Sequence, residues 1–153
     1  MRITDSIVEN CEFSGAVLAD CSAVRVEFRG CRMSGLVAAS ARFKDVRFIE
    51  CKLDQANLRM TTGERVAFLE CVLTSADFYS ARLRGARLLS CDLTGVEFSA
   101  ADLEGAFLHG SVLEGVRGGG SLRRVVIGTD QVVPLALAVF AALGVRIDDD
   151  AER

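Results

Sequence analysis

Apolar residues recur at every fifth position from Ile3 to Leu113, and the phase of this repeat does not slip. Every residue of the series is apolar except Gly63, and most are Leu or Phe. The residue two places earlier is usually Ala, Cys or Val, whereas the other three places of each block carry nearly all of the charge. A helix repeats every ~3.6 residues and a strand every ~2.0, so neither keeps this series on one side. The pattern therefore predicts a solenoid in which each five-residue block forms one side of a coil.

Five cysteines, Cys11, Cys31, Cys51, Cys71 and Cys91, are spaced by twenty residues. This spacing predicts a coil of four blocks, because three or five sides would scatter these residues over the surface. Coils stacked at about 4.8 Å would leave two further interpretations open, a disulfide between coils and a metal ladder. We favour small buried space-fillers, because reduced Cys behaves as a small hydrophobe and the sequence has a single His.

The blocks resemble the pentapeptide-repeat family, whose consensus is A(D/N)LXX, and the segment ADLEG at residues 101–105 matches it outright. The resemblance covers residues 1 to about 129. It implies a right-handed quadrilateral β-helix. Together with the repeat and the C-terminal segment it predicts an all-β solenoid of about five to six coils, with four pentapeptides per coil and a C-terminal α-helix. We expect the β-helix over residues 1–129, the helix over 130–144 and a tail over 145–153.

Two stretches depart from the regular repeat. The block TTGER, residues 61–65, is the weakest, and we expect a bulge there; the ring of Phe43 is expected to fill the space that Ala23 and Gly63 leave. Residues 116–124 are irregular because three glycines run together from Gly118. After them the repeat resumes one residue early, with Leu122 and Ile127 predicted to point inward.

The C-terminal segment QVVPLALAVFAAL is apolar on all sides, which predicts a helix that is covered on more than one face. Thr129 or Asp130 is expected to cap it, Gly144 to end it, and residues 145–147 to add a short strand. One face would plug the open end of the solenoid, and the other would pair with a second copy in a two-fold homodimer. The residues expected to act in the cap and the dimer are Val132, Val133, Leu135, Leu137, Val139, Phe140 and Leu143.

Outward positions mostly mix charges, but one side carries apolar residues at a spacing of twenty. Ile49, Leu69 and Leu89 would stack into an apolar ridge, which is typical of a contact surface. The alternatives are isolated surface residues or a ridge covered by the C-terminal segment. The candidate partner surface consists of Ile49, Ala67, Leu69, Leu89 and Phe107, with Glu50 and Glu70 as a polar rim.

Composition and motifs give no sign of enzyme chemistry. The formal charge of -3 predicts neither a nucleic-acid patch nor a decisive acidic tract. No apolar stretch is long enough to span a membrane and the first residues lack a secretory pattern, so we expect a cytoplasmic protein. The single histidine, His109, has no neighbouring nucleophile, and GGGS at 118–121 lacks the Lys of a phosphate-binding loop. No cofactor and no metal is implied.

Three functions are compatible with the sequence. The first is a non-enzymatic scaffold that binds a partner protein through a lateral face. The second follows from the resemblance: one branch of the family protects DNA gyrase from quinolones by mimicking DNA, and the segment 125–144, with Asp130 and Gln131 opening its helix, resembles the end of that branch. Because residues 1–115 carry only slightly more acidic than basic residues, this function is the alternative. The third is a purely structural, self-associating protein.

Overall fold

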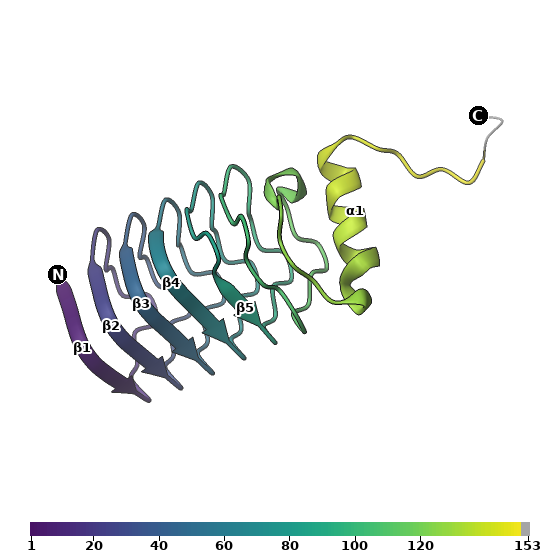
Figure 1. The fold of residues 1–153 in the computed structure, drawn as a ribbon. Helices are drawn as coiled ribbons and strands as arrows, with labels where there is room; N and C mark the ends of the chain where they lie inside the picture. The colour runs from purple at the N-terminus through teal and green to yellow at the C-terminus, as the bar shows by residue number, and fades with distance from the viewer. Residues whose placement is uncertain (151–153) are drawn as a thin grey trace.

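The computed structural model describes residues 1–150, which form a parallel β-solenoid with an α-helix at its C-terminal end (Figure 1). Neighbouring strands pair in chain order in one parallel sheet. These strands are β1 (Arg2–Glu9), β2 (Ser22–Arg29), β3 (Arg42–Ile49), β4 (Thr62–Leu69) and β5 (Arg87–Leu89). They are followed by the short 3₁₀ helices η1 (Gly119–Ser121) and η2 (Thr129–Gln131) and by the helix α1 (Val132–Ala142). The predicted solenoid with a C-terminal helix is confirmed.

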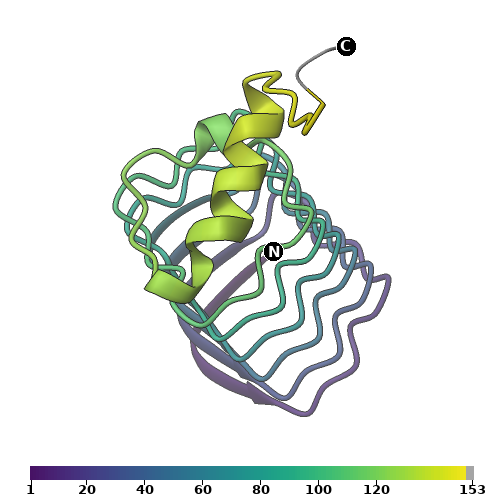
Figure 2. The ribbon, with the colours of Figure 1, turned by 90° about the vertical axis from the view of Figure 1, so that its right-hand side faces the viewer.

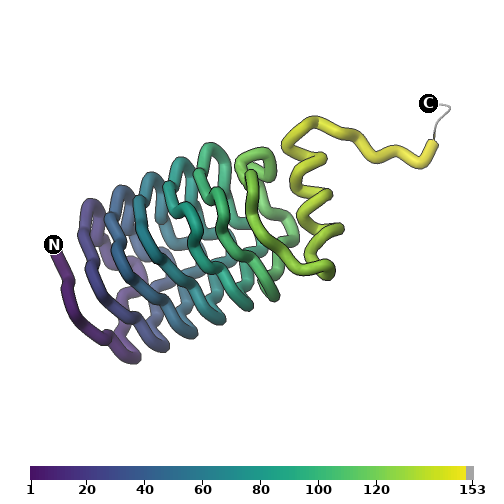
Figure 3. Tube along the Cα trace, in the orientation of Figure 1, coloured from purple at the N-terminus to yellow at the C-terminus, as the bar shows by residue number. Residues whose placement is uncertain are grey.

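Residues twenty apart lie side by side in successive coils. Phe28 pairs with Phe48 and Phe48 with Phe68 in the sheet, and the bridge between Val17 and Val37 keeps the same separation on another side. The trace in Figure 3 shows these coils stacked along the rod. Near the C-terminal end Phe107 pairs with Val126, one residue short of twenty, which confirms that the repeat resumes one residue early.

The period of five comes from the corners of the coil. Every fifth residue from Asp5 to Gly115 has a positive φ, so the chain turns once per block. Many of these corners carry residues other than glycine, such as Glu50 at φ 51° and Met60 at φ 56°. Residues other than glycine rarely adopt this left-handed backbone conformation, which implies that stacking between coils holds the corners in place.

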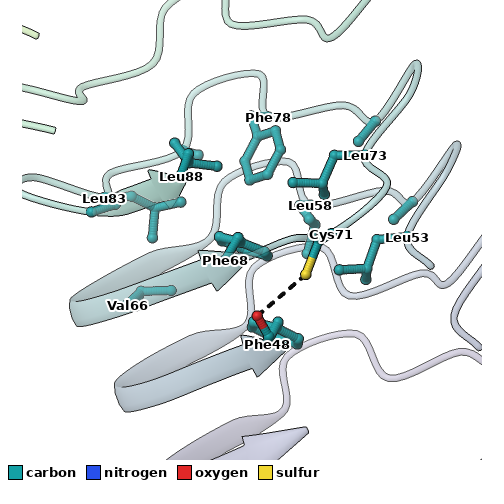
Figure 4. Packing of buried hydrophobic residues seen from close by; sticks show 14 of the residues in the cluster. Phe48, Leu53, Leu58, Val66, Phe68, Cys71, Leu73, Phe78, Leu83 and Leu88 are labelled. Carbon is teal, nitrogen blue, oxygen red and sulfur yellow. Dashed lines mark hydrogen bonds between the residues drawn. The ribbon is translucent and has the colours of Figure 1, made fainter. Parts of the chain in front are cut away.

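The interior is filled by the apolar series that the sequence predicts (Figure 4). The rings of Phe48 and Phe68 stack at 4.7 Å with an interplanar angle of 5°, and Phe78 meets Phe68 edge-on at 5.9 Å. One expectation about the weak block is wrong, because strand β4 runs through it in register with β3 and without a bulge. A side chain at Gly63 would meet the side chains of Val66 and Leu83 and the carbonyl oxygen of Phe43.

The five cysteines spaced by twenty form one column, which is buried from Cys31 onward, and all cysteines in the described chain are free thiols. Each thiol from Cys31 onward donates to a carbonyl oxygen twenty-three residues earlier; Cys71 Sγ lies 3.2 Å from the oxygen of Phe48. Ser111 continues the column with a 2.6 Å bond to the oxygen of Leu88. The column therefore fills space and donates to backbone carbonyls of the previous coil, with no disulfide in residues 1–150.

The start of helix α1 is fastened by Gln131, and the expected cap by Thr129 or Asp130 is wrong because both residues belong to η2. The Gln131 amide is buried and donates to the carbonyl oxygens of Leu108 and Ser111, the latter at 2.8 Å. Its Oε1 accepts from the backbone N–H of Gly128 at 2.9 Å.

The end of helix α1 follows the prediction in part. Gly144 at φ 70° ends the helix, and the N–H of Val145 donates to the oxygen of Phe140, so the closing turn satisfies the last carbonyls. The expected strand at 145–147 is wrong, since those residues have no strand partner and follow the turn as an extended segment. The last predicted tail residues, 151–153, lie outside the described chain. The end-on view in Figure 2 shows α1 crossing the end of the solenoid.

Candidate partner-binding surface

The predicted ridge residues lie next to one another at the ends of β3, β4 and β5. Ile49 is in register with Leu69, and Leu69 with Leu89. All three side chains are half-buried and contribute to the surface. In the next coil His109 continues this column, because its carbonyl oxygen accepts from the N–H of Ser90. The structure thus brings the three aliphatic residues together in one row along the rod.

The other candidate residues border this row. Glu50 and Glu70 are exposed corner residues that follow Ile49 and Leu69 directly in the chain. Phe107 is exposed and its ring stacks on that of His109, with 6.1 Å between centroids. Ala67 is only 8% exposed, so it lies below the surface that the ridge presents.

A hollow lies beside the ridge, over Ala67. Its volume is about 360 Å³, and its lining residues are Asp45, Arg47, Arg65, Val66, Ala67, Gly85 and Arg87. Arg47, Ala67 and Arg87 are in register in β3, β4 and β5. Sequence reasoning did not single out these arginines and missed the hollow. The missed signal is a small residue between two arginines at a spacing of twenty.

Ion pairs at the corners neutralise part of the charge around the hollow. Arg65 donates to both carboxylate oxygens of Asp45, the Nη2 bond being 3.1 Å long. This hydrogen bonding lowers the pKa of the Asp45 carboxyl, so Asp45 is ionised at neutral pH. Arg25 and Asp5 repeat the arrangement two coils earlier and lower the pKa of Asp5 in the same way.

The outward face of α1 is a second apolar surface. Side chains of Val132, Val133, Leu137, Phe140 and Leu143 are exposed by 40–69%. The opposite face lies on the last coil, where Ala138 is buried and Leu135 packs against the core, while Val139 is half-buried. Between the helix and residues 114–117 lies a second hollow of about 480 Å³.

The residues considered for catalysis or metal binding do not come together in residues 1–150. His109 is exposed, and no group of three or more His, Cys, Asp or Glu side chains in this range is placed to hold a metal ion. Within the same range there is no helix of the length and apolar character needed to cross a bilayer. The candidate contact surfaces are therefore the ridge, the arginine-lined hollow and the exposed face of α1.

Comparisons with known proteins agree with this architecture. A family model described as "Pentapeptide repeat region" matches residues 41–117, and one described as "Pentapeptide repeats (8 copies)" matches residues 2–35. Among curated proteins, none matches the sequence.

Three of the solved structures that are similar to this chain carry names that describe different roles. QnrB1, a plasmid-mediated fluoroquinolone resistance protein, is 18% identical, with 97% of this chain and 98% of that chain covered and a TM-score of 0.36. Rfr23, a pentapeptide repeat protein from the cyanobacterium Cyanothece, is 14% identical over 83% of this chain and 88% of that chain, with a TM-score of 0.38. HetL, involved in heterocyst differentiation regulation in Nostoc, is 21% identical over 76% of this chain and 63% of that chain, with a TM-score of 0.24.

Proposed function

Because the chain belongs to the pentapeptide repeat family, we propose that it is a non-enzymatic scaffold that binds a partner protein through a lateral face of its solenoid. The proposal includes the right-handed winding and the five to six coils that the sequence predicts. It also includes the division into a β-helix over 1–129, a capping and dimerisation helix over 130–144 and a tail, with no cofactor and a cytoplasmic setting.

The observation that carries this proposal is the ridge formed by Ile49, Leu69 and Leu89. Three aliphatic side chains in one row, bordered by exposed carboxylates at Glu50 and Glu70, have the arrangement of an apolar patch with a polar rim. The row lies on a sheet whose strands are fixed by pairing on both sides, so a partner would meet a rigid surface and lose little entropy in ordering it.

The test is an affinity purification of the tagged protein from its native cell, comparing the wild type with Leu69→Asp/Leu89→Asp. We expect the double variant to lose its specific partner, because an aspartate in the middle of an apolar contact is desolvated without a pairing group. Val72→Asp is the matched control, since Val72 is a partly exposed valine of the same coil on another side. Unchanged partners in a folded double variant would contradict the proposal.

A homodimer through α1 is part of the proposed assembly. The support is the exposed row of Val133, Leu137 and Phe140, because large apolar side chains at this density usually meet another protein surface. Light scattering should give twice the monomer mass for the wild type and the monomer mass for Leu137→Glu/Phe140→Glu. A monomeric wild type would refute the dimer but not the proposed lateral binding function. A protein that dimerises and captures no partner would support the purely structural alternative.

Modulation of DNA gyrase is the second candidate function. The observation in its favour is the Asp130–Gln131 pair, which ends η2 directly before α1 and whose glutamine fastens the helix to the last coil. The arginine-lined hollow speaks against DNA mimicry, which requires a continuous negative surface. A supercoiling assay with purified gyrase decides this candidate: neither inhibition by the protein nor protection from a quinolone would remove it.

A further inference from the structure

The hollow over Ala67 exists because a small residue separates two arginines in one column. Arg47, Ala67 and Arg87 are paired in register across β3, β4 and β5, so the two arginine Cα atoms are roughly 10 Å apart at the usual spacing of parallel strands. The methyl group of Ala67 forms an apolar floor between them. At the neighbouring corner Gly85 has no side chain, and an atom added there would meet nothing within 4 Å, so the hollow is open on that side.

The charge in the hollow is not balanced. Arg65 is paired with Asp45, and Arg47 has Glu27 at 3.4 Å on the far side of its column. Arg87, in contrast, has no carboxylate within ion-pair distance anywhere in residues 1–150, although it lines the hollow beside the apolar floor. A guanidinium on each side of a small floor is suited to an anionic group that enters between them, because arginine binds carboxylates through a planar fork of N–H donors.

The hollow and the ridge form one continuous surface. Ala67 and Leu69 lie two residues apart in the same strand and Arg87 and Leu89 in the next, so their side chains share one face of the sheet. We propose that the hollow binds the carboxylate of an Asp or Glu side chain in an acidic, aliphatic peptide segment of a partner protein. The aliphatic residues of that segment lie on Ile49, Leu69 and Leu89, and the carboxylate lies between Arg47 and Arg87. This inference rests on the proposed lateral scaffold function and specifies its partner.

Selection from a phage-displayed library of random short peptides tests the inference, with the immobilised wild-type protein as the target. The enriched peptides should carry an acidic residue close to aliphatic residues. Peptides synthesised from the selected sequences, each with its acidic residue kept or replaced by the matching amide, are then titrated against three variants. These are Arg87→Glu in the hollow, Arg42→Glu as a control at an exposed arginine of β3 that does not line the hollow, and Leu69→Asp in the ridge.

We expect Arg87→Glu to weaken binding of the acidic peptides by about tenfold or more, and Arg42→Glu to leave it unchanged. The amide peptides should bind more weakly to the wild type and should no longer distinguish Arg87→Glu from it. Binding should also weaken as salt is raised, because the contact is partly open to solvent. Circular dichroism of each variant establishes that the solenoid is folded.

The outcomes separate this inference from the function on which it rests. If Leu69→Asp abolishes binding of the selected peptides while Arg87→Glu does not, the ridge is a binding surface and the carboxylate site is refuted. If neither variant affects binding, both proposals fail. Enrichment of peptides without acidic residues, or absence of any enriched sequence, would each overturn the inference.

Discussion

A single methyl group placed at Gly119 should loosen the capping helix. Built on the backbone of Gly119, a Cβ atom would lie 2.6 Å from the backbone C and O of Ala138 and 2.8 Å from the nitrogen of Val139. Since ordinary contacts begin at about 3.4 Å, α1 must retreat by about 0.8 Å, and because these are helix backbone atoms the whole helix moves. Ala138, which is buried here, then loses its contact with the last coil.

The neighbouring glycine provides the matched control. A Cβ atom at Gly120 would meet only the methyl group of Ala142, at 3.9 Å, and neither glycine has a positive φ. Overpacking at Gly119→Ala should cost about 1–3 kcal/mol of the free energy of unfolding. Gly120→Ala should instead stabilise the protein by about 0.4–1 kcal/mol, because it restricts only the unfolded chain.

Two measurements check this pair. Each kcal/mol shifts the melting temperature of a domain of this size by about 2–4 °C, so thermal unfolding should place Gly119→Ala below the wild type and Gly120→Ala at or above it. Hydrogen exchange should be faster in residues 132–142 of Gly119→Ala while β2 and β3 keep their protection. Equal melting temperatures and equal exchange in the two variants would refute the close approach of η1 and α1.

Other perturbations test the interior, the helix anchor and the ionisable groups. Phe68→Ala removes a fully buried ring that stacks on Phe48 and meets Phe78 edge-on, and should cost about 3–5 kcal/mol in denaturant unfolding. Gln131→Ala removes the side-chain donor of two buried carbonyl oxygens, of which the oxygen of Leu108 keeps the N–H of Ser111, and should cost about 1–3 kcal/mol in the same assay. The pKa values of Asp5 and Asp45 are lowered below 3.8 in the folded protein. The stability that these carboxylates contribute is therefore present above pH 3.8 and is lost as the pH falls through the lowered pKa values. The melting temperature should drop over that acid range. Burial raises the pKa of the Cys31 thiol above 9.0, so this thiol should resist alkylation in the native protein near neutral pH and react once the protein is unfolded.

Each of these expectations has a result that contradicts it. Phe13→Ala, in the half-buried first coil, should cost less than Phe68→Ala, and equal costs would show that burial along the rod is uniform. A Gln131→Ala variant as stable as the wild type would mean that the buried amide does not fasten the helix to the last coil. If the melting temperature does not fall at acid pH in the wild type or in Asp45→Asn, the corner ion pairs do not contribute to stability. Rapid native alkylation of Cys31 would show that the cysteine column is open to solvent.

Much of the fold is predictable from the sequence because inward and outward residues alternate within each block. The apolar series from Ile3 to Leu113 and the cysteine spacing depend only on local order along the chain, and together they specify a coil of twenty residues. The ridge follows from the same spacing, since residues twenty apart must become neighbours once the coil is known. The corners are different: nothing in Glu50 or Met60 predicts a left-handed conformation, which only the stacked coils impose.

The candidate site shows the same division between sequence and structure. Ile49, Leu69 and Leu89 can be found by counting, but the hollow beside them depends on where neighbouring side chains end. Arg65 turns toward Asp45, Ala67 is too short to fill its place, and Arg87 is left without a carboxylate partner in the described chain. These are relations between side chains in different coils, and a repeat pattern does not encode them.

The sequence by itself determined that this protein is a solenoid, because the period of five and the spacing of twenty leave few other ways to bury one apolar series. Only the tertiary structure decided how the rod is closed and where its surface is hollow. The helix α1 is held by the close approach of Gly119 and by the buried amide of Gln131, and the arginine-lined hollow arises between coils. Both depend on distances of a few ångströms between segments far apart in the chain, which local periodicity does not specify.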